Sequence, residues 1–161
     1  MERQANHVIR KFREGKQSFG MQMYIPSPEL YECCGWKGFD FVMIDMEHTR
    51  INYETMSNLI RCCEMTNMTP FARVPSPEAK YIRYALEAGA RGIVVPHVKS
   101  AEDVKKAQTA LRFPPEGHAE IRLCHGEKRR AGAGVLRARQ PCARLRVCAR
   151  GAKTEEAHAW I

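Results

Sequence analysis

Features that would place the protein in a membrane or outside the cell are missing from its 161 residues. No apolar run approaches the roughly 18 residues that a membrane-spanning helix needs. The N-terminal segment, MERQANHVIRKFREGK, has charged residues where a signal peptide has its apolar region. We therefore expect no membrane span and a cytoplasmic location. The length predicts one domain and is too short for a complete eight-unit (β/α) barrel, which typically needs about 250 residues.

The seven cysteines also lack a recognisable metal-binding spacing, because no C-x-x-C occurs in the sequence. Four of them form two adjacent pairs, Cys33-Cys34 and Cys62-Cys63. An odd number of cysteines in a chain without an export signal indicates reduced thiols. Those that fall in helices are expected to pack as small apolar side chains.

Positive charge is concentrated toward one end of the chain. Residues 1–117 carry 16 basic and 14 acidic side chains, whereas residues 118–161 carry 10 basic and 4 acidic ones. The second segment has 8 Arg and 9 Ala but no Asp, Asn, Ser, Met, Phe or Tyr. We therefore divide the chain into a domain, 1–117, and a basic Arg/Ala-rich tail, 118–161, which we interpret as frameshifted or disordered. The only structural signal in the tail is a weak amphipathic helix through Val135, Leu136, Leu145 and Val147.

Residues 1–117 alternate between strand and helix signals. The segment 39–45 (FDFVMID) is a near-continuous apolar run, as expected for a parallel strand that is covered on both faces. Asn52 is placed to cap a helix, and Ser76-Pro77-Glu78 is predicted to start another. The predicted strands are 18–24, 39–45, 69–74 and 92–98, and the predicted helices begin near residues 28, 53, 77 and 101. The alternation predicts an α/β fold of about four βα units, with a parallel sheet and right-handed crossovers.

Polar residues gather where the predicted strands end. Asp45, Glu47 and His48 follow the second strand, Arg73 ends the third, and His97 lies at the end of the fourth. The carboxyl ends of parallel strands form one cleft, so these side chains are expected to lie close together. A histidine beside carboxylates can act as a general base, and an arginine can bind a carboxylate or stabilise an enolate oxygen. Considered singly, each signal has a plainer alternative. The Glu47-His48 pair could be solvated in a loop, and Arg73 could form a surface ion pair.

The motifs FDFVMIDMEH, PFARVP, LEAGARGIVVPHVKSAEDVKKA and RFPPEG follow in this order within residues 8–117. This ordered set resembles the HpcH/HpaI aldolase family, the 4-hydroxy-2-oxoheptanedioate aldolases and their relatives. The resemblance implies the N-terminal half of a TIM-type (β/α)8 barrel. It also implies a class II pyruvate aldolase, a carbon–carbon lyase that cleaves 4-hydroxy-2-oxo acids to pyruvate and an aldehyde. A divalent metal (Mg²⁺, Mn²⁺ or Co²⁺) and a homo-oligomer are implied for the full-length family.

The resemblance also implies roles for particular residues. It makes His48 the acid/base histidine, and Arg73 the residue that binds the substrate and stabilises the enolate. Glu87 stands where many members have an aspartate that pairs with this histidine, so a longer acid occupies that place. Gln22 lies in the segment that lines the pocket of the family. His97 is expected to be a pocket or subunit-contact residue.

The segments that carry the metal-binding Glu and Asp of the family, E-T-x-x-A and G-P-x-D, have no counterpart in the sequence. No residue is therefore predicted to bind the metal, and we expect a truncated chain that stabilises little enolate by itself. Two alternatives stay open: a citrate-lyase-like acyl lyase of the same superfamily, and a non-enzymatic fragment whose basic tail binds nucleic acid. Trp160 is the only aromatic ring of the tail besides histidine, which gives base stacking little support. The expected partners are small molecules, a 2-oxo acid and an aldehyde.

Overall fold

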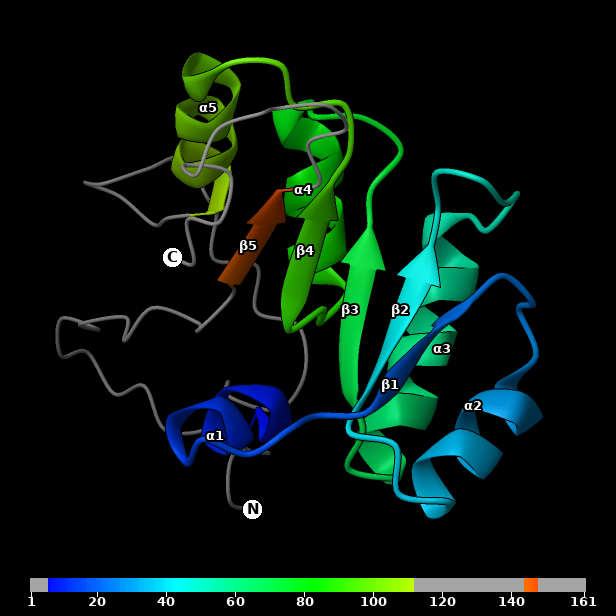
Figure 1. The fold of residues 1–161 in the computed structure, drawn as a ribbon. Helices are drawn as coiled ribbons and strands as arrows, with labels where there is room; N and C mark the ends of the chain where they lie inside the picture. The colour runs from blue at the N-terminus through cyan, green and yellow to red at the C-terminus, as the bar shows by residue number, and fades with distance from the viewer. Residues whose placement is uncertain (1–5, 112–143, 148–161) are drawn as a thin grey trace, which may run out of the picture.

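A computed structural model describes residues 6–111 and 144–147 of the chain (Figure 1). The helices are α1 (His7–Arg13), α2 (Pro28–Trp36), α3 (Tyr53–Met65), α4 (Ala79–Glu87) and α5 (Ala101–Leu111). The strands are β1 (Gly20–Met23), β2 (Phe41–Asp45), β3 (Thr69–Arg73), β4 (Gly92–Val95) and β5 (Arg144–Val147). The predicted α/β alternation is confirmed. No helix within the described ranges is long and apolar enough to cross a bilayer.

The sheet has five strands in the sequential order β1-β2-β3-β4-β5, and each pairs in parallel with the next. The fifth strand lies in the segment 118–161, which we interpreted as a frameshifted or disordered tail. A helix through Leu145 and Val147 is therefore wrong for residues 144–147, because β4 offers an open edge with which this segment pairs. The other residues of the predicted tail lie outside the described residues. So do residues 112–117, which precede the predicted boundary.

The helix side of β2 is buried, and its other side is only partly covered near the start of the strand. In β2, Val42 and Ile44 are buried, whereas Phe41 and Met43 point to the opposite face and are partly exposed. A sequential strand order with crossovers of one hand places the connecting helices on the same side of the sheet. Figure 1 shows α2, α3 and α4 behind the strands. The predicted coverage of the β2 segment is therefore complete on the helix side and partial on the other.

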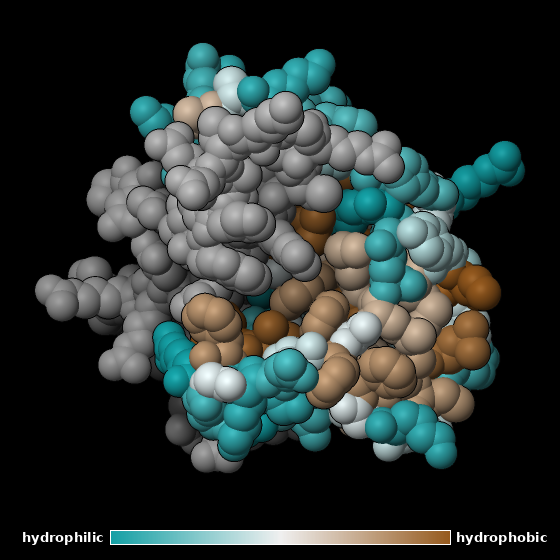
Figure 2. All heavy atoms as spheres, in the orientation of Figure 1, coloured by the Kyte–Doolittle hydropathy of each residue, from teal (hydrophilic) through white to brown (hydrophobic). Residues whose placement is uncertain are grey.

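The partly covered face carries apolar side chains, as Figure 2 shows for the side turned to the viewer. On this face the rings of Phe41 and Phe71 stack with their centroids 5.2 Å apart. Gly92 lies beside this pair, and a Cβ at that position would come within 2.6 Å of the Phe71 ring. The close approach explains why glycine begins β4.

Local signals set most of the helix starts. Asn52 accepts a hydrogen bond from the backbone N–H of Thr55 (2.8 Å), so the predicted cap of α3 is confirmed. The predicted start of α4 is wrong by two residues, because Glu78 and not Ser76 is the N-cap. The Ser76 hydroxyl instead donates to the Glu78 carboxylate (3.2 Å) and closes a local turn.

Helix α1 was not expected from the sequence, and a buried ion pair attaches it to the sheet. Lys11 Nζ lies 2.7 Å from Oδ1 of Asp40, whose side chain is only 8% exposed. The same carboxylate accepts a hydrogen bond from the backbone N–H of Phe19 (2.8 Å). Figure 1 shows α1 at the amino-terminal ends of the strands, opposite the end where polar residues were predicted to gather.

The Asp40→Asn substitution should loosen α1 and lower the free energy of unfolding by about 2 kcal/mol, because a buried charged acceptor is lost. Urea unfolding measures the stability, and amide hydrogen exchange should show faster exchange in α1 than in wild type. The matched control is Glu14→Gln, which removes an exposed ion pair with Lys16. Equal effects of the two substitutions would contradict an anchoring role of Asp40.

Candidate active site at the carboxyl ends of the strands

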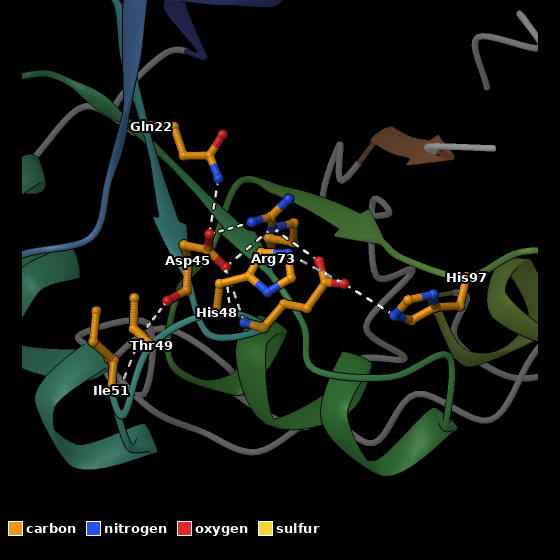
Figure 3. A network of polar contacts seen from close by, with 8 residues as sticks. Gln22, Asp45, His48, Thr49, Ile51, Arg73 and His97 are labelled. Atoms are coloured by element: carbon orange, nitrogen blue, oxygen red, sulfur yellow. Dashed lines mark hydrogen bonds and ion pairs between the residues drawn. The ribbon is translucent and has the colours of Figure 1, made fainter. Parts of the chain in front are cut away.

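Four neighbouring strands each bring one polar residue to the same edge of the sheet (Figure 3). Gln22 comes from β1, Asp45 ends β2 and Arg73 ends β3. His97 follows β4 by two residues. The predicted site residues Gln22 and Arg73 thus lie in one network of polar contacts, as expected for the carboxyl ends of parallel strands.

Asp45 is the centre of this network and is fully buried. It is the register partner of Arg73, whose Nε and Nη2 donate hydrogen bonds to the two oxygens of the carboxylate. Gln22 Nε2 donates to the same carboxylate (2.8 Å). The backbone N–H groups of Glu47 (2.9 Å) and His48 (3.1 Å) donate to Oδ1 of Asp45. One carboxylate therefore fixes both the guanidinium and the loop that carries the histidine.

The charges of the pair reinforce each other. Burial acts to raise the pKa of Asp45, but hydrogen bonds from Arg73, the loop N–H groups and Gln22 outweigh it, and the pKa lies below its usual range. The bond to Asp45 raises the pKa of Arg73 further, although burial opposes this. Asp45 is therefore ionised and Arg73 is charged throughout the physiological range.

Glu47 bridges Arg73 and the two histidines. Its side chain is 10% exposed, with Oε2 at 3.1 Å from Arg73 Nε and Oε1 at 3.0 Å from His97 Nε2. His48 Nε2 lies farther away, at 3.7 Å from the same Oε1. The His48 side chain is 62% exposed, so its imidazole is accessible at the rim of the network.

Glu87 lies apart from this network in the contacts recorded for the described residues. It is the last residue of α4, where its Oε1 is 3.7 Å from Nε of Arg83, one turn earlier. The carboxylate next to His48 is instead that of Glu47. Pairing between Glu87 and His48 stays a prediction.

Sequence reasoning gave Asp45 and Glu47 no chemical role, although a local signal was present. In D-x-E-H the acid at the first position can accept the N–H groups two and three residues later, as in an Asx turn. This is how Asp45 holds the loop. The loop is fixed further by Thr49, whose hydroxyl donates to the backbone carbonyl of Asp45.

One edge of the Arg73 guanidinium offers hydrogen-bond donors to a ligand. Asp45 and Glu47 contact Nε and Nη2 of Arg73, so within the described part of the chain the N–H groups of Nη1 have no partner. A guanidinium held in this way can donate two hydrogen bonds to a carboxylate or an enolate oxygen.

The residues that the structure describes do not form a site for a divalent metal. No group of three His, Cys, Asp or Glu side chains among the described residues is arranged to hold a metal ion. The carboxylates of Asp45 and Glu47 are already in contact with the Arg73 guanidinium. Oxygens that face a fixed cation are poor ligands for a second one.

Asp45→Asn should lower the free energy of unfolding by about 3 kcal/mol at pH 7, because it removes the charge that compensates Arg73. The lowered pKa of Asp45 means that its contribution is present above the ordinary Asp pKa and is lost as the pH falls through the lowered value. Urea unfolding between pH 7 and pH 3 should therefore show a flatter acid limb in the variant. Gln22→Ala, which removes one neutral donor, should cost only about 1 kcal/mol. An unchanged acid limb in Asp45→Asn would contradict this account.

Comparison with solved structures relates this arrangement to known enzymes. A crystal structure of the citrate synthase SbnG matches with a TM-score of 0.69 and 36% identity, over 73% of this chain and 48% of that one. Macrophomate synthase matches in fold with a TM-score of 0.72 and 22% identity, over 89% of this chain and 52% of that one. The neighbours have a TIM-barrel-type fold of which about half is covered, and the described sheet is a partial barrel.

Curated relatives point the same way. A pyruvate aldolase of Rhizobium etli is 32% identical over 117 residues, 73% of this chain and 46% of that relative. A hydroxypyruvate/pyruvate aldolase of Roseobacter denitrificans is 31% identical over 143 residues, 89% of this chain and 55% of that relative. The chain spans about half the length of the curated relatives it matches. The family model described as HpcH/HpaI aldolase/citrate lyase matches residues 19–145, and the chain belongs to this family.

Proposed function

We propose that the chain carries the substrate-binding and acid–base part of a carbon–carbon lyase site that acts on 2-oxo acids. The expected reaction is the cleavage of 4-hydroxy-2-oxo acids to pyruvate and an aldehyde. The observation that supports it is the Arg73 guanidinium, which Asp45 and Glu47 hold through Nε and Nη2, so that Nη1 donates to no other described residue. A cytoplasmic location and a homo-oligomer belong to the same proposal.

The residues present can perform two parts of this reaction. Cleavage of the carbon–carbon bond leaves an enolate, and Arg73 can bind the substrate carboxylate or the oxygen on which charge develops. The hydroxyl of the substrate must lose its proton, and His48, exposed beside Glu47, can accept it. The divalent metal that the resemblance implies would supply Lewis-acid stabilisation, but the described residues do not form its site.

A second candidate is citrate-type chemistry, which the 36% identity to a citrate synthase favours. Its substrates carry several carboxylates, and Arg73 could bind one of them in the same way. Citrate should then compete for the site more strongly than pyruvate does. The pyruvate reaction stays our first proposal, because curated relatives that act as pyruvate aldolases cover up to 89% of the chain.

Pyruvate should bind the chain through Arg73, which nuclear magnetic resonance (NMR) can detect as saturation transfer to the pyruvate methyl group. Arg73→Ala should abolish the signal, because the fixed donors of Nη1 are lost. Arg61→Ala is the matched control, since Arg61 is an arginine of α3 that contacts Asn58 at the surface. A signal that survives in Arg73→Ala would contradict the proposal. Loss of the pyruvate signal when citrate is added at a lower concentration than pyruvate would favour the second candidate.

The chain with added Mg²⁺, Mn²⁺ or Co²⁺ should not exchange the methyl protons of pyruvate for deuterium. The physical reason is that His48 and Arg73 alone stabilise little enolate when no described residue holds a metal. Proton NMR of pyruvate in deuterated buffer measures the exchange, with metal and buffer alone as the control. Exchange that disappears in His48→Ala would contradict this expectation and show that the chain completes its own site.

A further inference from the structure

One contact joins the loops after β2 and β4 across the end of β3. Glu47 reaches Arg73 with Oε2 (3.1 Å) and His97 with Oε1 (3.0 Å), so its carboxylate lies between a guanidinium and an imidazole. We propose that His97 is a positioning residue, which holds Glu47 against Arg73 and so fixes the direction in which Arg73 presents Nη1. The consequence for substrate rests on the proposed function, whereas the effect on Arg73 does not.

The backbone of His97 supports this role. Its φ of 58° lies in the left-handed region, and Asn67 is the only other non-glycine residue with positive φ among the described residues. Such a conformation costs free energy and persists where surrounding contacts hold it. Here Pro96 ends the strand, because proline has no N–H for the ladder, and the chain then turns. Figure 3 shows the His97 ring directed toward the network from the side of β4.

The charges of Asp45, Glu47 and Arg73 explain why an imidazole beside Glu47 is favourable. Asp45 and Glu47 place two carboxylates against one guanidinium, so the group of three carries one excess negative charge. Glu47 is 10% exposed and has little water to offset that charge. An imidazole can donate its Nε2–H to the carboxylate when neutral and adds a positive charge when protonated.

His97 is better placed for this purpose than His48. The two imidazoles approach the same oxygen of Glu47, but His97 Nε2 is at 3.0 Å and His48 Nε2 at 3.7 Å. The first distance is that of a direct polar contact, and the second is beyond it. His48 is thereby left available for the proton step that we propose, while His97 holds the carboxylate.

The Nε–H signal of Arg73 in NMR tests the inference, because this proton lies against Asp45 and Glu47. Arg73→Lys identifies the signal by its disappearance. His97→Gly removes the imidazole and readily accepts the left-handed backbone, so it should leave the fold intact and make this proton exchange roughly tenfold faster. His97→Gln, which keeps a donor of similar reach, should restore most of the protection.

The matched control is His7→Ala, which deletes an imidazole of α1 that contacts Arg10 and should leave the Arg73 signal unchanged. An unchanged exchange rate in His97→Gly would overturn the inference. A rate raised equally by His7→Ala would also overturn it, because the effect would then be general loosening.

Pyruvate binding separates this inference from the proposed function. If wild type binds pyruvate, His97→Gly should weaken binding several-fold, with His97→Gln close to wild type. If wild type binds no pyruvate, the proposed function fails, and the exchange rate of the Arg73 Nε–H still decides whether His97 positions Arg73.

Discussion

The buried ion pair between Asp45 and Arg73 is the interaction on which the rest of the site depends. The two residues are register partners on β2 and β3, so the sheet itself brings the carboxylate to the guanidinium. Because Asp45 has no exposure to water, its charge must be compensated inside the protein. The same carboxylate also accepts hydrogen bonds from Gln22 and from the backbone N–H groups of the following loop, and so holds both in place. A single buried charge thus organises three segments of the chain.

The sheet topology explains why the site lies where it does. Sequential parallel strands end at one edge, and their connecting helices lie on one face. The opposite end of the sheet carries α1, which the Lys11–Asp40 pair attaches to the sheet. Polar side chains at the carboxyl ends can therefore face a ligand while the strands beneath them stay rigid. This division between a stabilising end and a reactive end is typical of barrel enzymes.

Within the described part of the chain, the network leaves some polar groups accessible. Asp45 and Glu47 contact Nε and Nη2 of Arg73, and no contact of Nη1 with another described residue is seen. His48 is exposed, whereas Glu47 beside it is nearly buried. The chain covers about half of its relatives, and the residues that would hold a metal are not among those described. In the function that we propose, the described part is one side of a site, which binds a substrate carboxylate through Arg73 and places His48 as the proton acceptor.

The sequence by itself determined the βα alternation, the cap of α3 at Asn52 and the placement of Arg73 and His48 at adjacent strand ends. These features follow from local patterns, because apolar periodicity and capping act over a few residues. It did not reveal α1, the strand β5 or the start of α4, where pairing and packing with distant segments decide. Only the tertiary structure showed that Glu47 contacts His97, 50 positions away in the numbering. This contact depends on how the ends of β2 and β4 meet in space, and a local sequence pattern contains no distance between them.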